Sequence, residues 1–81
     1  MLMPGMLTLQ QMAALDKARG AQFDRLFLQS MIMHHEGAIS MVKALMASPG
    51  ATQDVNVFRF ANDVMGHQSA EIDRMRRMLA A

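Results

Sequence analysis

Residues 27–46, FLQSMIMHHEGAISMVKALM, place apolar side chains in two adjacent rows that repeat every three or four positions. One row contains Phe27, Met31, His34, Ala38, Met41 and Leu45. The row beside it contains Leu28, Ile32, His35, Ile39, Val42 and Met46. This spacing predicts an amphipathic α-helix with a wide apolar face, because side chains on a strand would alternate every second residue.

Turn residues mark the end of this helix and the start of the next. Ser48-Pro49-Gly50 stops it, because proline breaks the hydrogen-bond ladder and glycine permits a turn, so we expect a helix over about residues 22–47. Thr52 is a suitable N-cap for a second long helix over about residues 53–80. An apolar row of that helix contains Phe58, Ala61, Met65, Gln68, Ile72, Met75 and Leu79.

A shorter helix precedes these two. Thr8 and Gln11 have the spacing of a capping box, in which each side chain bonds the other residue's backbone N–H. Gly20 suits the left-handed position that follows the end of a helix. We therefore expect a short helix over about residues 9–19.

The two long helices match in length, at about 40 Å each, and are expected to pair as an antiparallel hairpin. The helix over residues 22–47 has two apolar rows but only one partner in such a hairpin. Exposure of the second row costs about 25 cal/mol per Å². We therefore expect an all-α fold of one domain, residues 1–81, with a four-helix bundle completed by a homodimer.

Composition excludes several functional classes. Eight Lys and Arg residues balance seven Asp and Glu residues, which gives no basic surface for nucleic acid. No apolar run reaches the roughly 18 residues of a membrane-spanning helix, so no membrane insertion is expected. The start, MLMPGMLTL, lacks the pattern of a signal peptide, and we expect any export signal to lie outside this sequence. The absence of cysteine excludes disulfides and thiolate ligands, whereas 11 of the 81 residues are methionine.

The histidines and methionines raise the possibility of a metal site. His34, His35 and His67 fall on inward or boundary rows of the expected helices. A histidine in an apolar row usually finds a local hydrogen-bond partner, and methionine rows usually fill a core. Two adjacent buried imidazoles, however, carry a desolvation cost that simple packing avoids. Imidazole and thioether together suit Cu(I) and Ag(I), with thioethers available from Met31, Met41, Met65 and Met75.

Other chemistries fit the sequence less well. A ferritin-type di-iron site needs Glu-x-x-His, but Ile39 and Arg74 stand three residues after the two helical glutamates. A zinc-protease helix needs His-Glu-x-x-His, which His35-Glu36 begins and Ile39 interrupts. Zinc bound by three histidines would leave the methionines unexplained and ranks below copper and silver. No set of acid, base and nucleophile is visible, so we predict that the protein is not an enzyme.

Further residues recur around the double histidine in a pattern typical of a known family. The first block comprises Phe23-Asp24, Phe27-Leu28, Met31-Ile32, His34-His35, Gly37-Ala38-Ile39 and Met41. A second block comprises Gln68, Glu71-Ile72, Met75 and Leu79, and the lead comprises Met3-Pro4-Gly5-Met6-Leu7-Thr8. Over nearly the whole chain, these residues resemble the domain of unknown function 305 family.

The resemblance implies a ferritin-like fold and an exported protein, periplasmic or extracellular. It also implies binding of Cu(I) or Ag(I) in copper resistance, with ligands at Met31, His34, His35, Met41 and Met75, supported by Gln68 and Glu71. Family members commonly carry two copies of this helical unit in tandem. This chain carries one, and its start resembles that of the second copy.

We therefore expect a soft-metal-binding protein in which histidine and methionine ligands from facing helices share one interior pocket. Affinity should fall below about pH 6, because histidine must be neutral to bind a metal. The alternative is a helical dimerisation or protein-interaction module whose methionine-rich face binds another chain and no metal.

Overall fold

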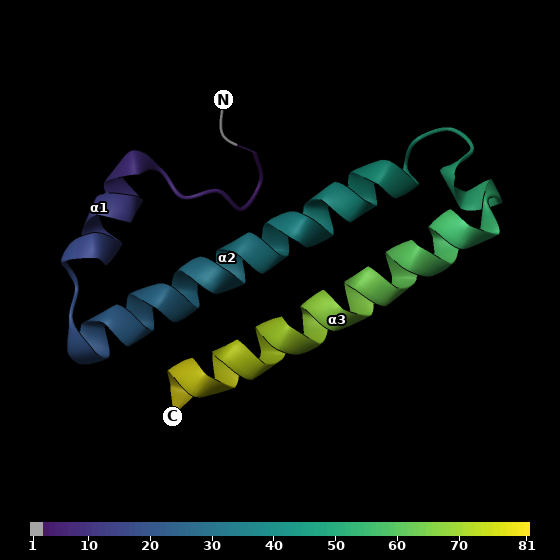
Figure 1. Cartoon of the computed structure of the whole chain (residues 1–81). Coiled ribbons are helices and arrows are strands. Elements are labelled where there is room, and N and C mark those ends of the chain that lie inside the picture. The colour runs from purple at the N-terminus through teal and green to yellow at the C-terminus, as the bar shows by residue number, and fades with distance from the viewer. Residues whose placement is uncertain (1–2) are drawn as a thin grey trace.

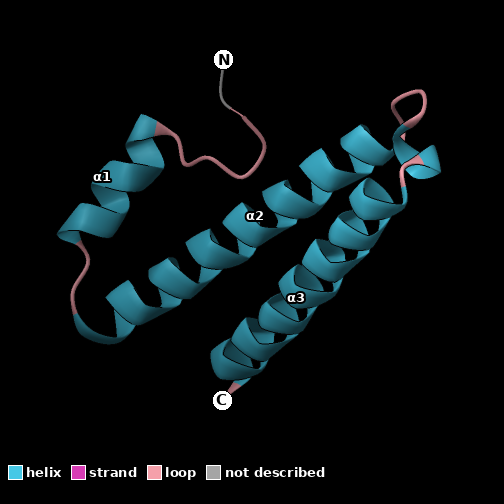
Figure 2. Cartoon of the chain, turned by 45° about the vertical axis from the view of Figure 1, so that its right-hand side comes forward, coloured by secondary structure: helices cyan, strands magenta, loops and turns pink. Residues whose placement is uncertain are grey.

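The computed structural model describes residues 3–81, and these residues form helices joined by short links. The elements are α1 (Leu9–Lys17), α2 (Gly20–Met46), the 3₁₀ turn η1 (Ala51–Gln53) and α3 (Val55–Ala80), with no strand within 3–81. Figure 1 shows α2 and α3 side by side as an antiparallel hairpin, and Figure 2 shows α1 on the opposite side of α2. The all-helical prediction and the long hairpin are confirmed. None of the described helices is both long and apolar enough to cross a bilayer.

The start of α1 follows the predicted capping box. The Thr8 hydroxyl accepts a hydrogen bond from the Gln11 N–H at 3.0 Å, and the Gln11 side chain accepts one from the Thr8 N–H at 2.8 Å. The predicted end at Gly20 is wrong, because α1 ends at Lys17 and buried Ala18 already has extended backbone. Gly20 does adopt a left-handed φ of +62°, but as the first residue of α2.

The predicted start of the second long helix also differs from the structure. Helix α2 ends before Ser48-Pro49-Gly50, as expected, and Gly50 has a φ of +82°. Thr52 is not the N-cap of α3, because it lies within the 3₁₀ turn. Asp54 takes that role, and its carboxylate accepts hydrogen bonds from the N–H groups of Asn56 and Val57.

The two apolar rows of α2 have different surroundings. In the row that contains Ile32 and His35, both of these residues are buried, and α3 contributes buried Ala61 and Ile72. In the other row, Phe27, Met41 and Leu45 each expose more than two-fifths of their surface. The expectation that this row stays partly exposed in a single chain is therefore confirmed.

The dimensions reflect this incomplete core. The molecule extends over 47 × 31 × 14 Å with a radius of gyration of 15.3 Å, against about 12 Å for a compact domain of this length. Its accessible surface of 6165 Å² is about 1,300 Å² larger than the roughly 4,850 Å² expected for a compact monomer of this mass. The hairpin is therefore more extended than a compact domain of its length.

The N-terminal segment covers the middle of the exposed row. Met3–Met6 form a turn in which the Met6 N–H donates to the Met3 carbonyl at 3.1 Å, with Pro4 and left-handed Gly5 at its centre. The turn packs on α2 at Gly37, where a Cβ would lie 2.4 Å from the Pro4 carbonyl oxygen. Gly37 therefore permits a close approach of this turn to α2. In Figure 1 this segment runs back alongside α2.

Gly37→Ala should displace the N-terminal turn. Alanine favours a helix by up to about 1 kcal/mol over glycine, but the new methyl group would overlap the Pro4 backbone, an overlap that typically costs about 1–3 kcal/mol. Gly66→Ala on α3 is the matched control, since nothing lies within 4 Å of its Cβ position. Denaturant unfolding should show that Gly66→Ala is neutral or stabilising and that Gly37→Ala is less stable than this control. Equal stabilisation by both substitutions would contradict the close packing.

Candidate functional site

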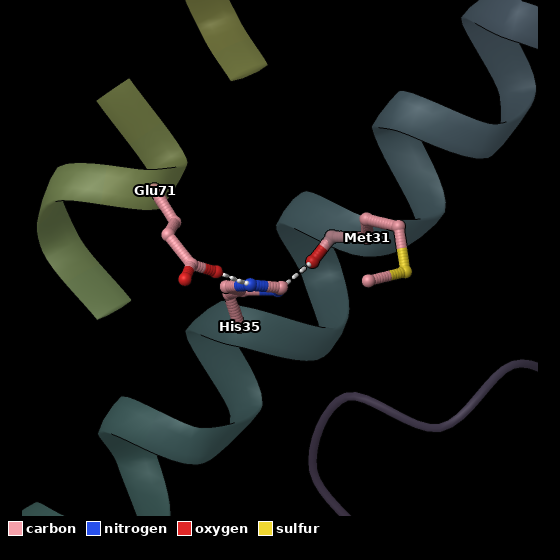
Figure 3. A network of polar contacts seen from close by, with 3 residues as sticks. All are labelled: Met31, His35 and Glu71. Atoms are coloured by element: carbon pink, nitrogen blue, oxygen red, sulfur yellow. Dashed lines mark hydrogen bonds and ion pairs between the residues drawn. The ribbon is translucent and has the colours of Figure 1, made fainter. Parts of the chain in front are cut away.

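His35 links the two long helices. His35 is only 8% exposed, and its ring lies between a backbone carbonyl of α2 and a carboxylate of α3. Nδ1 lies 2.7 Å from the carbonyl oxygen of Met31, one turn earlier in α2. Nε2 is hydrogen-bonded to the Glu71 carboxylate (Figure 3). Both ring nitrogens of this buried histidine therefore have partners.

The protonation of the ring determines what these contacts can do. Both partners, the Met31 carbonyl and the Glu71 carboxylate, accept hydrogen bonds. A doubly protonated ring donates to both of them, one bond from Nδ1 and one from Nε2. A neutral ring that keeps its proton on Nδ1 still donates to Met31 and directs the Nε2 lone pair toward α3. Histidines that bind metals commonly donate their second ring N–H to a backbone carbonyl, which fixes the tautomer in this way. The Glu71 side chain is 60% exposed, so it has room to turn into water and free Nε2.

A groove of about 300 Å³ adjoins the His35 ring. It contains three methionines, Met31 from α2 and Met75 and Met78 from α3. Its other lining residues are Phe27, Leu28, Glu71 and Arg74. Figure 3 shows that the Met31 side chain extends away from Glu71, whereas Met75 and Met78 follow Glu71 by one and two turns along α3. We call this space the His35 groove.

The predicted metal ligands do not all meet in one pocket. The structure brings His35, Met31, Glu71 and Met75 to the His35 groove. His34 and His67 are exposed, and the remaining predicted ligands, Met41, Met65 and Gln68, do not line this groove. A single chain therefore does not bring His34 and His35, with His67 as a possible third ligand, into the one interior pocket that was expected.

The separation of the two adjacent histidines has a simple geometric cause. Consecutive residues of an α-helix point about 100° apart, so neighbours in sequence do not share a face. The ring centroids of His34 and His35 are 6.2 Å apart, and their planes are inclined by 75°. His35 faces α3, whereas His34 faces the N-terminal segment, with which it lines a different groove.

Met78 is a member of the groove that sequence reasoning missed. It lies seven residues after Glu71, on the same row of α3, and that spacing is the signal that would have identified it. Its exposure in the isolated chain and its place near the end of α3 make it an unremarkable surface residue in a helical pattern.

The groove does not resemble a site for a hard metal ion. Within residues 3–81, no three or more His, Cys, Asp or Glu side chains gather closely enough to hold a metal. Glu36, the acid that follows His35, is exposed, as expected for a surface charge. Its Oε1 lies 3.6 Å from Nη2 of Arg76. The donors near His35 are thioethers with a single carboxylate, a set that favours soft ions over hard ones.

Comparison with known proteins identified one family. The family described as Domain of unknown function (DUF305) matches residues 1–79 of the chain. No significant match was found among curated proteins or among solved structures.

Glu71→Ala should destabilise the hairpin by about 1–2 kcal/mol, because the buried Nε2 of His35 loses its partner. Glu36→Ala is the matched control on α2, since its ion pair with Arg76 is exposed at both ends and contributes little. Urea unfolding measures both effects. If the two variants unfold at the same urea concentration, the bond between His35 and Glu71 does not contribute to stability.

Proposed function

We propose a soft-metal-binding function for this chain, which belongs to the DUF305 family. The ion is Cu(I) or Ag(I), and its site is the His35 groove. We assign no catalytic step to the protein. The family description names no function, so the proposal rests on the chemistry of the side chains.

One observation carries the proposal: a buried imidazole with a fixed Nδ1 opens onto a groove lined by thioethers. The hydrogen bond from Nδ1 to the Met31 carbonyl orients the ring and leaves Nε2 as the metal-binding atom. Met75 and Met78 provide thioethers from α3, and Met31 lines the same groove from α2. Cu(I) and Ag(I) accept such soft and borderline donors.

Glu71 and a bound ion would compete for the same atom, Nε2 of His35. In the described structure the Glu71 carboxylate is bonded to Nε2, so an ion that binds there must displace it. Because the Glu71 side chain is largely exposed, the displaced carboxylate gains water as its new partner. Its negative charge beside the groove also favours a bound cation. The proposed site in the His35 groove does not include His67, Met41, Met65 or Gln68 as ligands.

The second candidate function is a helical interaction module without metal. It is favoured by the fact that both nitrogens of His35 already have partners, which is sufficient for a structural histidine. The two functions differ in a thermal melt. A metal-binding protein is stabilised by Ag(I) through mass action, whereas an interaction module that binds no metal is not.

We also propose that two chains pair into a ferritin-like four-helix bundle. The support is the exposed row of α2, which includes Phe27, Met41 and Leu45. The surplus surface of about 1,300 Å² per chain exceeds the roughly 800 Å² per partner that a stable interface buries. A second copy is the simplest partner, because its own hairpin carries the same unpaired row.

An exported location and a role in copper handling or resistance complete the proposal. Thioethers bind soft ions without forming disulfides, so a site of methionine and histidine remains usable where thiols would oxidise. The chain has 11 methionines and no cysteine, as such a compartment would favour.

Ag(I) should bind more tightly than Zn(II), and Met75→Leu should weaken Ag(I) binding about tenfold, because one thioether is lost. Met46→Leu is the matched control, since it makes the same volume-conserving change in α2 outside the His35 groove. Competition titrations monitored by isothermal calorimetry measure these affinities. Equal or tighter Zn(II) binding would contradict the proposal.

Leu45→Glu should shift the protein from dimer to monomer, because it places a charge in the exposed apolar row. Ser40→Glu adds the same charge on the polar face of α2 and should leave the dimer intact. Light scattering coupled to size-exclusion chromatography reports the mass of each variant. A wild-type protein that is monomeric at high micromolar concentration would contradict the bundle.

A further inference from the structure

His34 lines a second groove, which adjoins the His35 groove on α2 because Phe27 and Met31 line both. This space, of about 470 Å³, is formed by the N-terminal segment, α1 and α2. Within residues 3–81, no hydrogen bond or ion pair engages the His34 ring, in contrast to that of His35. We call this space of about 470 Å³ the His34 groove.

Three methionines line the His34 groove together with His34. Met6 comes from the N-terminal turn, Met12 from α1 and Met31 from α2. Its other lining residues are Gly5, Leu7, Leu15, Phe27 and Ser30, so no carboxylate lines it. Figure 3 shows that the Met31 side chain extends away from Glu71, and Met31 lines both this space and the His35 groove.

The backbone around this groove is held at several points. Gly5 lies so close to α2 that a Cβ there would be 2.9 Å from the His34 carbonyl oxygen and 3.0 Å from the His34 Cα. The turn that contains Gly5 also carries Met6, whose sulfur accepts a hydrogen bond from the Met3 N–H at 3.4 Å. Met12 lies in the first turns of α1, directly after the capping box of Thr8 and Gln11.

We propose that the His34 groove is a second soft-ion site, in which His34 and the thioethers of Met6, Met12 and Met31 bind one Cu(I) or Ag(I). The choice of ion rests on the proposed function of the His35 groove, but the ligands other than Met31 are different. Imidazole and thioether ligands carry no negative charge, so a divalent ion would receive no charge compensation from the groove. A monovalent soft ion needs fewer ligands and less compensation.

A bound ion would fasten the N-terminal turn to α2. The described contacts of α1 are weak, since none of its residues is buried and it packs against α2 alone. An ion held by Met6, Met12 and His34 adds bonds between three segments that otherwise meet through the glycine contact and a few apolar side chains. Ion binding at this site is therefore coupled to ordering of the N-terminal segment.

Native mass spectrometry of the full chain with Ag(I) tests the site by counting ions. The wild-type protein should bind two Ag(I) per chain. The double variant Met6→Leu/Met12→Leu and the single variant His34→Leu should each bind one, whereas Met33→Leu, in α2 outside the groove, should still bind two. Met6 and Met12 are exposed, so their replacement does not threaten the fold, which circular dichroism verifies.

The pattern of losses separates this inference from the proposed function. If His35→Leu abolishes all binding and the Met6/Met12 variant retains the wild-type count, the second site does not exist. If His35→Leu retains one ion that is lost in His34→Leu/His35→Leu, both sites exist. If His35→Leu keeps the wild-type count while His34→Leu binds none, the His34 groove is the only site and the proposed function of the His35 groove fails.

Hydrogen exchange provides a second readout that does not depend on counting. Ag(I) should slow amide exchange in residues 3–7 of the wild-type protein, because the ion holds this segment against α2. The effect should persist in Met75→Leu, which changes only the His35 groove, and disappear in Met6→Leu/Met12→Leu. Unchanged exchange in the wild-type protein would overturn the site.

Discussion

The burial of one apolar row of α2 against α3 is the interaction on which the rest of the structure depends. It buries Ile32 and His35 of α2 with Ala61 and Ile72 of α3, and these residues form most of the core of the chain. The adjacent row of α2 is only partly covered, and Phe27, Met41 and Leu45 in it remain exposed. Within the described residues, the N-terminal turn packs on α2 at Gly37 beside this row.

The same helical geometry gives the two adjacent histidines opposite environments. His35 is buried, and its ring is oriented by the Met31 carbonyl and by Glu71. His34 lines the neighbouring groove with Met6, Met12 and Met31, and its ring lacks such partners among the described residues. Adjacent histidines on a helix therefore line two different grooves. Met31, one turn before His35, lines both grooves.

Two glycines determine how closely the N-terminal turn approaches α2. Gly5 adopts a left-handed φ of +85°, and Gly37 presents bare backbone on the facing surface of the helix. A side chain at either position would overlap backbone atoms, which cannot move aside as a flexible side chain can. This contact converts an exposed part of the helix into the wall of a groove and places Met6 beside His34.

The sequence by itself determined the helices, their approximate ends and the presence of an unpaired apolar row, because these features follow from local spacing and from residues such as Pro49 and Gly50. It misplaced two boundaries, at Gly20 and Thr52, because glycine and threonine can serve either side of a link and the neighbouring backbone decides which. Only the tertiary structure decided which methionines accompany which histidine. Met78 is 43 residues from His35 and Met6 is 28 from His34, and no spacing rule connects residues on different elements. Such pairings arise from the register of α3 on α2 and from the path of the N-terminal turn, which packing sets between segments far apart in the chain.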